Sequence, residues 1–131
     1  MIKAFTLTAL AILLSACAAP TQAPTPTPDP VALFGSIAED GLQCLEENNV
    51  PNPTVSYDVT QTQSLVSPLA GIIRVTDAKH AGTNPDGTEI MVQRVFELNY
   101  LFQGGSWVPT EVKEIQGDLA SETDPVNLCF P

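Results

Sequence analysis

Five of the twelve prolines of this 131-residue chain fall within residues 18–30, which read AAPTQAPTPTPDP. Each proline fixes φ near about −65° and lacks an amide proton, so proline alternating with threonine stays extended and solvated. At about 3.1 Å per residue, such a segment reaches roughly 40 Å. The chain is therefore divided into a leader, a spacer over 17–30 and a domain over 31–131. A recognition segment for a proline-binding groove is the alternative to a plain spacer.

The leader has the pattern of a secretory signal peptide. Residues 1–3 carry one positive charge on Lys3, and residues 4–14 are apolar except for Thr6 and Thr8. Small residues follow, which completes the order of charged, apolar and small segments. The apolar stretch is shorter than the roughly 20 residues that a membrane-spanning helix needs. We therefore expect residues 1–16 to direct export and then to be removed.

The leader ends at Leu14-Ser15-Ala16-Cys17. This tetrapeptide resembles the lipobox of bacterial lipoproteins, in which an aliphatic residue and two small residues precede a cysteine. The resemblance implies cleavage before Cys17, a diacylglycerol on its thiol and a further acyl chain such as palmitate on its amine. Two or more chains give stable membrane anchoring. The alternative is Ala16-Cys17-Ala18 as an ordinary cleavage site that releases a soluble protein.

The residue after the lipidated cysteine, Ala18, bears on the destination of the protein. In Gram-negative lipoproteins, aspartate at this position commonly retains the protein in the inner membrane. The resemblance therefore implies that a chain with Ala18 passes to the outer membrane, where its domain faces the periplasm. In a cell with one membrane, the same anchor would hold the domain on the outer face.

The charge of the chain limits its partners. Fifteen acidic and five basic residues give a formal charge of −10. This composition cannot neutralise a run of phosphates, which excludes nucleic-acid binding as a main activity. It also argues against attraction to anionic lipid surfaces. The basic residues are Lys3, Arg74, Lys79, Arg94 and Lys113.

One amphipathic helix of about 18 residues opens the domain. Asp29 is a suitable N-cap, and Pro30 suits the first helical position because the amide proton that it lacks would have no partner there. Asn48-Asn49 and the prolines that follow end the pattern. The apolar face of the helix contains Phe34, Ile37, Gly41, Cys44 and Leu45.

After the helix the apolar period changes to two, which predicts strands. Residues 83–87 and Gly104-Gly105 predict tight turns, and residues 77–82 are expected to form a loop. Pro109 predicts an edge strand or a bulge, because it cannot donate a ladder hydrogen bond. The predicted strands cover 55–60, 69–76, 90–102 and 107–115.

These elements predict an α+β fold, with one N-terminal amphipathic helix packed on an antiparallel sheet of about four strands. A domain of about 100 residues buries a modest core. The order of the elements resembles that of cystatin-like and nuclear-transport-factor-like domains, in which a helix lies in a curved sheet. This resemblance depends on the pattern of elements and on no motif.

Cys44 and Cys129 remain as a pair once Cys17 is assigned to the lipid. Exported proteins lie in oxidising compartments, so we expect a disulfide that holds the C-terminal tail on the helix. The alternative is a pair of buried free thiols. A redox role is not indicated, because the sequence has no C-x-x-C motif.

The sequence contains no recognisable catalytic or metal-binding motif. His80 is the only histidine, and an exposed position in its loop is favoured over a role as catalytic base. Acidic pairs on the helix fit a solvated face, and residues 86–89 lack the aspartate spacing of a calcium loop. We therefore expect no catalytic residue, no metal and no cofactor, and we do not expect an enzyme.

Two residues of the predicted sheet are candidate contacts for a ligand or partner. Arg94 interrupts the apolar face of residues 90–102, so it either reaches the rim of the sheet, which is favoured, or faces a concave pocket. Trp107 lies beside the hairpin glycines, where core packing is favoured over an exposed contact.

Two functions of different classes remain. The first is a non-enzymatic, lipid-anchored module that binds or scaffolds another envelope protein, for example at the sheet edge near Val108-Pro109. An inhibitor of an envelope-attacking hydrolase belongs to this class. The second is a small-ligand pocket or minor enzyme with Arg94 in its cavity. A filled core behind Phe96 and Tyr100 favours the first function, and an open cavity favours the second.

Overall fold

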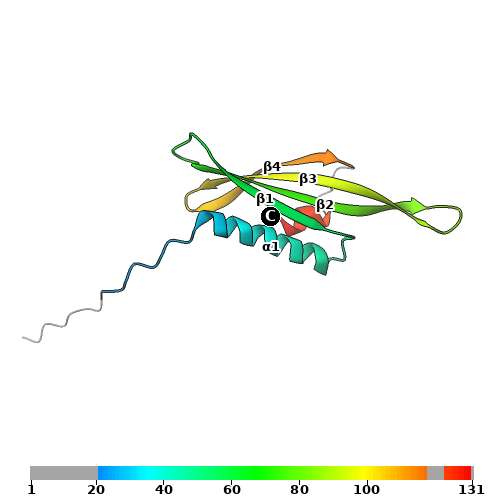
Figure 1. Ribbon diagram of the computed structural model, residues 1–131, viewed down its shortest axis with the longest axis horizontal. Helices are drawn as coiled ribbons and strands as arrows, with labels where there is room; N and C mark the ends of the chain where they lie inside the picture. The colour runs from blue at the N-terminus through cyan, green and yellow to red at the C-terminus, as the bar shows by residue number, and fades with distance from the viewer. Residues whose placement is uncertain (1–20, 118–122, 131) are drawn as a thin grey trace, which may run out of the picture.

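The computed structural model describes residues 21–117 and 123–130. Its strands pair in chain order and all pairs are antiparallel, while α1 lies across one face of the sheet (Figure 1). The predicted α+β fold is confirmed, and the short helix α2 is present in addition to the predicted elements. The elements are α1 (Pro30–Glu47), β1 (Thr54–Gln61), β2 (Leu69–Thr83), β3 (Glu89–Gln103), β4 (Ser106–Gln116) and α2 (Pro125–Cys129).

Capping residues define both ends of α1. The Asp29 carboxylate accepts a hydrogen bond from the N–H of Val31 at 3.0 Å, and Pro30 is the first helical residue. After the helix, Asn49 takes a φ of 58°, which lets the N–H of Val50 return to a carbonyl of the last turn at 3.1 Å. Asparagine tolerates this left-handed conformation better than most residues. The helix therefore begins and ends where its capping residues predict.

The core lies between α1 and the face of the sheet that it covers. Register pairs such as Ile73 with Leu98 place apolar side chains from neighbouring strands together on this face. Phe96 and Tyr100 are 0% and 2% exposed, so a filled core lies behind them. The buried apolar residues are Phe34, Ala38, Leu45, Ile73, Val75, Phe96, Leu98, Tyr100, Val126 and Phe130.

Two glycines let aromatic rings approach the backbone closely. A Cβ added at Gly71 on β2 would overlap the ring of Phe34 from α1. A Cβ added at Gly41 on α1 would overlap the ring of Phe130, which follows α2. These gaps allow α1 to pack against both the sheet and the C-terminal tail.

The predicted loop over residues 77–82 is wrong, because β2 continues to Thr83, with a shift in its register with β3 between His80 and Gly82. The strand is hidden in the sequence because its inward position after Val75 is the charged residue Asp77. Asp77 is nevertheless 1% exposed, since it pairs with a cation inside the fold. A buried ion pair therefore replaces the apolar residue that the alternation pattern requires.

Beyond this point β2 and β3 continue past the end of α1 as a two-stranded arm (Figure 1). We call residues 78–92 the β2–β3 arm. Three consecutive apolar residues on it, Ile90, Met91 and Val92, are 40–41% exposed. The arm therefore presents apolar side chains to solvent away from the core.

The predicted turns and the predicted effect of proline are confirmed. Gly104 and Gly105 connect β3 to β4 with φ values of 58° and 83°, and Gly87 has a φ of 87° in the turn between β2 and β3. Pro109 lies in β4, which is an edge strand, and the β3–β4 register shifts beside it. An edge position with a bulge suits a residue that lacks an N–H.

Candidate functional site

Arg94 is buried in a cluster of three charged side chains and is only 4% exposed. Its Nε donates to Oδ1 of Asp77 at 2.8 Å, and its Nη2 donates to Oδ2 of the same carboxylate at 2.6 Å. Its Nη1 donates to Oδ2 of Asp124 at 2.6 Å. The favoured interpretation of Arg94 as a rim residue is therefore wrong. The two carboxylates compensate a charge that would otherwise be too costly to bury.

The Arg94 cluster joins the sheet to the C-terminal tail. Asp77 on β2 lies opposite Arg94 on β3 in the strand register. Asp124 is the N-cap of α2, where its carboxylate accepts the N–H of Val126 at 3.1 Å ahead of Pro125. The Asp124 side chain thus caps α2 and also pairs with Arg94 on β3. This pairing holds the beginning of α2 against the sheet.

The ion pairs shift the pKa values of Arg94 and Asp124 in directions that keep these two groups charged. The hydrogen bonds to Asp77 raise the pKa of Arg94, those to Asp124 add to this, and burial acts against it. Burial alone would raise the pKa of Asp124. Hydrogen bonds from Arg94 and Val126, with the attraction of Arg94 and Lys79, outweigh burial and lower this pKa. Because the guanidinium is bound by carboxylates, we assign Arg94 a structural role.

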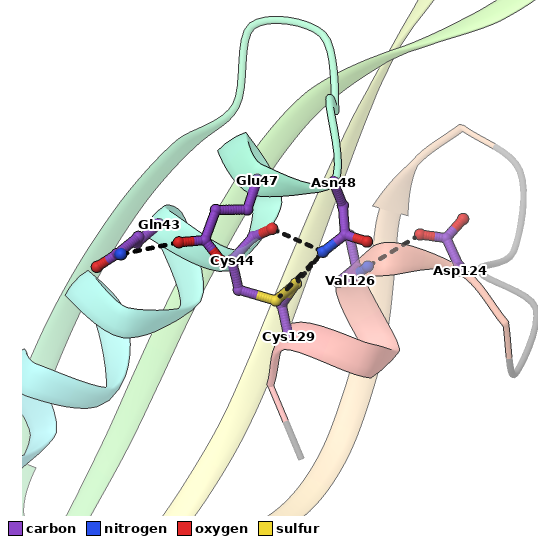
Figure 2. Close-up of a disulfide and its surroundings, with 7 residues drawn as sticks. All are labelled: Gln43, Cys44, Glu47, Asn48, Asp124, Val126 and Cys129. Carbon is purple, nitrogen blue, oxygen red and sulfur yellow. Dashed lines mark hydrogen bonds between the residues drawn. A yellow bond between two sulfur atoms is a disulfide. The ribbon is translucent and has the colours of Figure 1, made fainter.

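The predicted pairing of Cys44 with Cys129 is present (Figure 2). The disulfide joins α1 to the last residue of α2, with Cα atoms 5.5 Å apart and 85 residues of sequence separation. Beside it, Nδ2 of Asn48 donates to the carbonyl oxygen of Cys44 at 2.8 Å. The tail is therefore held at Asp124 where α2 begins and at Cys129 where it ends.

Trp107 packs against the core, as the favoured interpretation predicts. Its ring centroid lies 4.3 Å from that of Phe34 and 5.2 Å from that of Phe102. Its Nε1 donates to the carbonyl oxygen of Pro30 at 2.8 Å. Trp107 thus connects the start of β4 to the first turn of α1, and it remains half-buried.

A groove of about 370 Å³ lies between α1, α2 and the beginning of β4, and we call it the α1–β4 groove. Tyr100, at 2% exposure, is the most buried of its lining residues, because the others are half-buried or exposed. Leu128 is 60% exposed at its side. The groove is lined by Ile37, Asp40, Tyr100, Trp107, Leu128 and the Cys44–Cys129 disulfide.

The hydroxyl of Tyr100 has no hydrogen-bond partner within residues 21–117 and 123–130. Its Oη is buried, and none of the residues that the structure describes donates to it or accepts from it. Burial raises the pKa of this hydroxyl, so it stays protonated and available as a donor. Buried polar groups normally have a partner. The Tyr100 hydroxyl therefore departs from this rule among the described residues.

The remaining candidate residues lie away from the groove or outside the described ranges. His80 is exposed on the β2–β3 arm. Cys17 and Ala18 lie outside the described residues. Within 21–117 and 123–130, no group of three or more His, Cys, Asp or Glu side chains is placed to hold a metal ion. In the same ranges, no helix is long and apolar enough to cross a membrane.

Comparison with known proteins assigns no family. No protein-family model, curated protein or solved structure matches the chain. The fold and the site define the class as a small α+β domain closed by a disulfide, preceded by residues 21–29, which are exposed and contain no helix or strand. Its function is therefore argued from its own residues.

Proposed function

We propose that the chain is a lipid-anchored lipoprotein of a bacterial cell envelope, whose domain binds another envelope protein and catalyses no reaction. The observation that carries this proposal is Leu14-Ser15-Ala16-Cys17, placed between an apolar leader and a spacer. Residues 21–29 are exposed and contain no helix or strand, and the fold begins at Pro30. Cys17 is thus separated from the domain by enough chain to reach a membrane surface.

The disulfide and the residue after Cys17 support a location. A disulfide between Cys44 and Cys129 suits the oxidising periplasm or cell surface. Ala18, in place of aspartate, supports transport to the outer membrane. We therefore propose a domain that is held at the outer membrane and faces the periplasm.

The arrangement of the fold supports a partner-binding role for the β2–β3 arm. The spacer leaves the molecule at the start of α1, and the arm projects from the opposite end (Figure 1). The exposed apolar residues Ile90, Met91 and Val92 would then lie far from the anchor. The charge of −10 suits a basic partner, such as a hydrolase that the domain inhibits.

The alternative of a ligand pocket or active site centred on Arg94 is not favoured, although Arg94 and Asp124 line a cavity of about 260 Å³. The face of Phe96 and Tyr100 is part of the buried core. The guanidinium of Arg94 is hydrogen-bonded to two carboxylates, so a ligand would have to displace them.

Replacing Cys17 by serine is expected to abolish lipid attachment, because serine has no thiol to accept the diacylglycerol. Metabolic labelling with a fatty-acid analogue should mark the wild type and leave Cys17→Ser unlabelled. A Cys129→Ala variant keeps Cys17 and serves as the control that must still be labelled. Equal labelling of the wild type and Cys17→Ser would contradict the lipoprotein assignment.

Partner binding can be located by a photo-crosslinking amino acid placed at three exposed positions of the anchored protein. We expect a discrete crosslinked species from Met91 on the arm and none from Ser36 on α1. Val108 on the edge strand β4 is the third position, since it is 40% exposed. Crosslinking from Val108 alone would show that the partner contacts the sheet edge at β4 and not the arm. Absence of a discrete product at all three positions would contradict the binding role.

A further inference from the structure

The β1–β2 loop, residues 62–68, presents two adjacent apolar side chains to solvent. Leu65 is 99% exposed and Val66 is 77% exposed, which exceeds the exposure of every other large apolar residue of the described chain. The base of the loop is closed, since the N–H of Thr62 donates to the carbonyl oxygen of Pro68 at 2.8 Å. An ordered loop therefore holds an apolar tip in water, where its side chains gain nothing from burial.

The β1–β2 loop lies at the end of the domain where α1 begins and the spacer leaves, and the β2–β3 arm lies at the opposite end (Figure 1). In the loop, Oγ of Ser67 accepts a hydrogen bond at 2.7 Å from Nε2 of Gln103, the last residue of β3. Beyond the β3–β4 turn, Nε1 of Trp107 donates at 2.8 Å to the carbonyl oxygen of Pro30, the first residue of α1. These contacts join the loop to the point at which the spacer enters the fold.

Charged residues are absent from this end of the sheet. The chain has fifteen acidic and five basic residues, yet residues 59–73 and 98–110 contain none of them. The strand register places the two ranges side by side, because Leu69 lies opposite both Gln61 and Phe102. We call these two ranges the uncharged end. A surface that enters lipid must be free of charge, since burying an unpaired charge is costly.

We propose that the β1–β2 loop inserts Leu65 and Val66 into the lipid bilayer that anchors the chain, an inference that rests on the proposed lipid attachment at Cys17. A bilayer is favoured as the occupant because the spacer leaves from the uncharged end and reaches roughly 40 Å. The spacer confines this end to the membrane at a high effective concentration, so a contact of two side chains suffices. The single charge of the spacer is on Asp29, whose carboxylate caps α1.

The proposed contact also orients the domain. With the uncharged end on the lipid, the β2–β3 arm points away from the bilayer, where a protein partner can reach it (Figure 1). The charged residues of the domain lie beyond the uncharged end. They are therefore kept from anionic headgroups, which would repel a chain with a formal charge of −10.

A fluorophore at the loop tip tests the proposal on the full-length, acylated chain in vesicles of phosphatidylcholine. Leu65→Cys introduces a thiol for the environment-sensitive probe NBD, because Cys44 and Cys129 form the disulfide and the thiol of Cys17 would carry the lipid. Met91→Cys, at an exposed apolar residue of the arm, is the matched control. We expect the emission from Leu65→Cys to shift to shorter wavelength and to be quenched by phosphatidylcholine with brominated acyl chains. The control should show neither effect.

Two changes beside the probe test whether entry into lipid depends on apolar character. In the labelled Leu65→Cys chain, Val66→Asp should abolish both the shift and the quenching, since a carboxylate resists transfer into lipid. Val66→Leu keeps an apolar side chain and should retain both. Val66 is exposed on the loop, so neither change disturbs the core.

Flotation of the vesicles on a density gradient separates this inference from the lipid anchor. A chain that does not float with the vesicles contradicts both. A chain that floats while its Leu65 probe stays in water overturns the insertion of the loop and leaves the anchor intact. A shift to shorter wavelength without quenching by brominated lipid would show burial against a second copy of the chain, which also overturns the proposal. Quenching that Val66→Asp does not alter has the same consequence.

Discussion

Replacing Arg94 by methionine is expected to destabilise the domain by about 3–5 kcal/mol. The substitution keeps an unbranched apolar stem but leaves two carboxylates, on Asp77 and Asp124, buried without their cation. Leaving a buried charge without its partner destabilises a protein far more than the intact ion pair stabilised it. Domains of this size are stable by only about 5–15 kcal/mol, so this change removes a large share of the total. Urea denaturation at pH 7 measures it.

The matched control is Arg74→Met. Arg74 pairs with Glu97 at 3.0 Å, but its side chain is 58% exposed. Exposed pairs of this kind contribute about 0–1 kcal/mol, so we expect little change. A loss for Arg94→Met as small as that for Arg74→Met would contradict the assignment of the buried cluster.

The pH dependence of the same variant separates electrostatics from packing. In the wild type the pKa of Asp124 is lowered, so its contribution is present above the ordinary carboxyl range and is lost as the pH falls through the lowered value. In Arg94→Met the carboxyl is buried without a cation, which raises its pKa above that of the unfolded chain. The variant should therefore recover stability relative to the wild type between pH 7 and about pH 5. A packing defect alone would not produce this recovery.

The regular elements were predictable because their signals are local. Asp29-Pro30 marks the start of α1, Gly104-Gly105 marks a turn, and the alternation in residues 90–102 marks a strand. Each of these depends on the residue itself and on its near neighbours along the chain. The pairing of Cys44 with Cys129 was predictable for another reason, since assigning Cys17 to the lipid leaves two cysteines.

The burial of Arg94 was not predictable in this way, because its cause is distant in sequence. Asp77 and Asp124 lie 17 and 30 residues from Arg94. Taken one at a time, each of these charged residues predicts an exposed position, and Asp77 also predicts a loop. One signal was available: Asp124-Pro125 repeats the Asp-Pro cap that opens α1, and so marks a second helix. The burial of the Tyr100 hydroxyl without a partner among the described residues left no signal in the sequence.

Removing the disulfide is expected to cost about 4 kcal/mol, because the bond closes a long loop in the unfolded chain. The loop spans 85 residues, which makes its closure entropy large. Cys44→Ala and Cys129→Ala should lower the denaturation midpoint by similar amounts, since each removes the same crosslink. The double variant should lose no more than either single variant. Reductant should lower the midpoint of the wild type and leave that of the double variant unchanged.

The disulfide also stabilises α2, which is too short to be stable by itself. α2 has five residues, and isolated helices of this length are unstable in water. It is held at Cys129 by the disulfide (Figure 2). It is also held at Asp124 by Arg94, so the two restraints act on the same tail. Combining Arg94→Met with Cys44→Ala should therefore cost less than the sum of the two changes, as expected for residues that stabilise one unit. Strict additivity, or a wild-type midpoint that reductant does not alter, would show that the tail is held by other contacts.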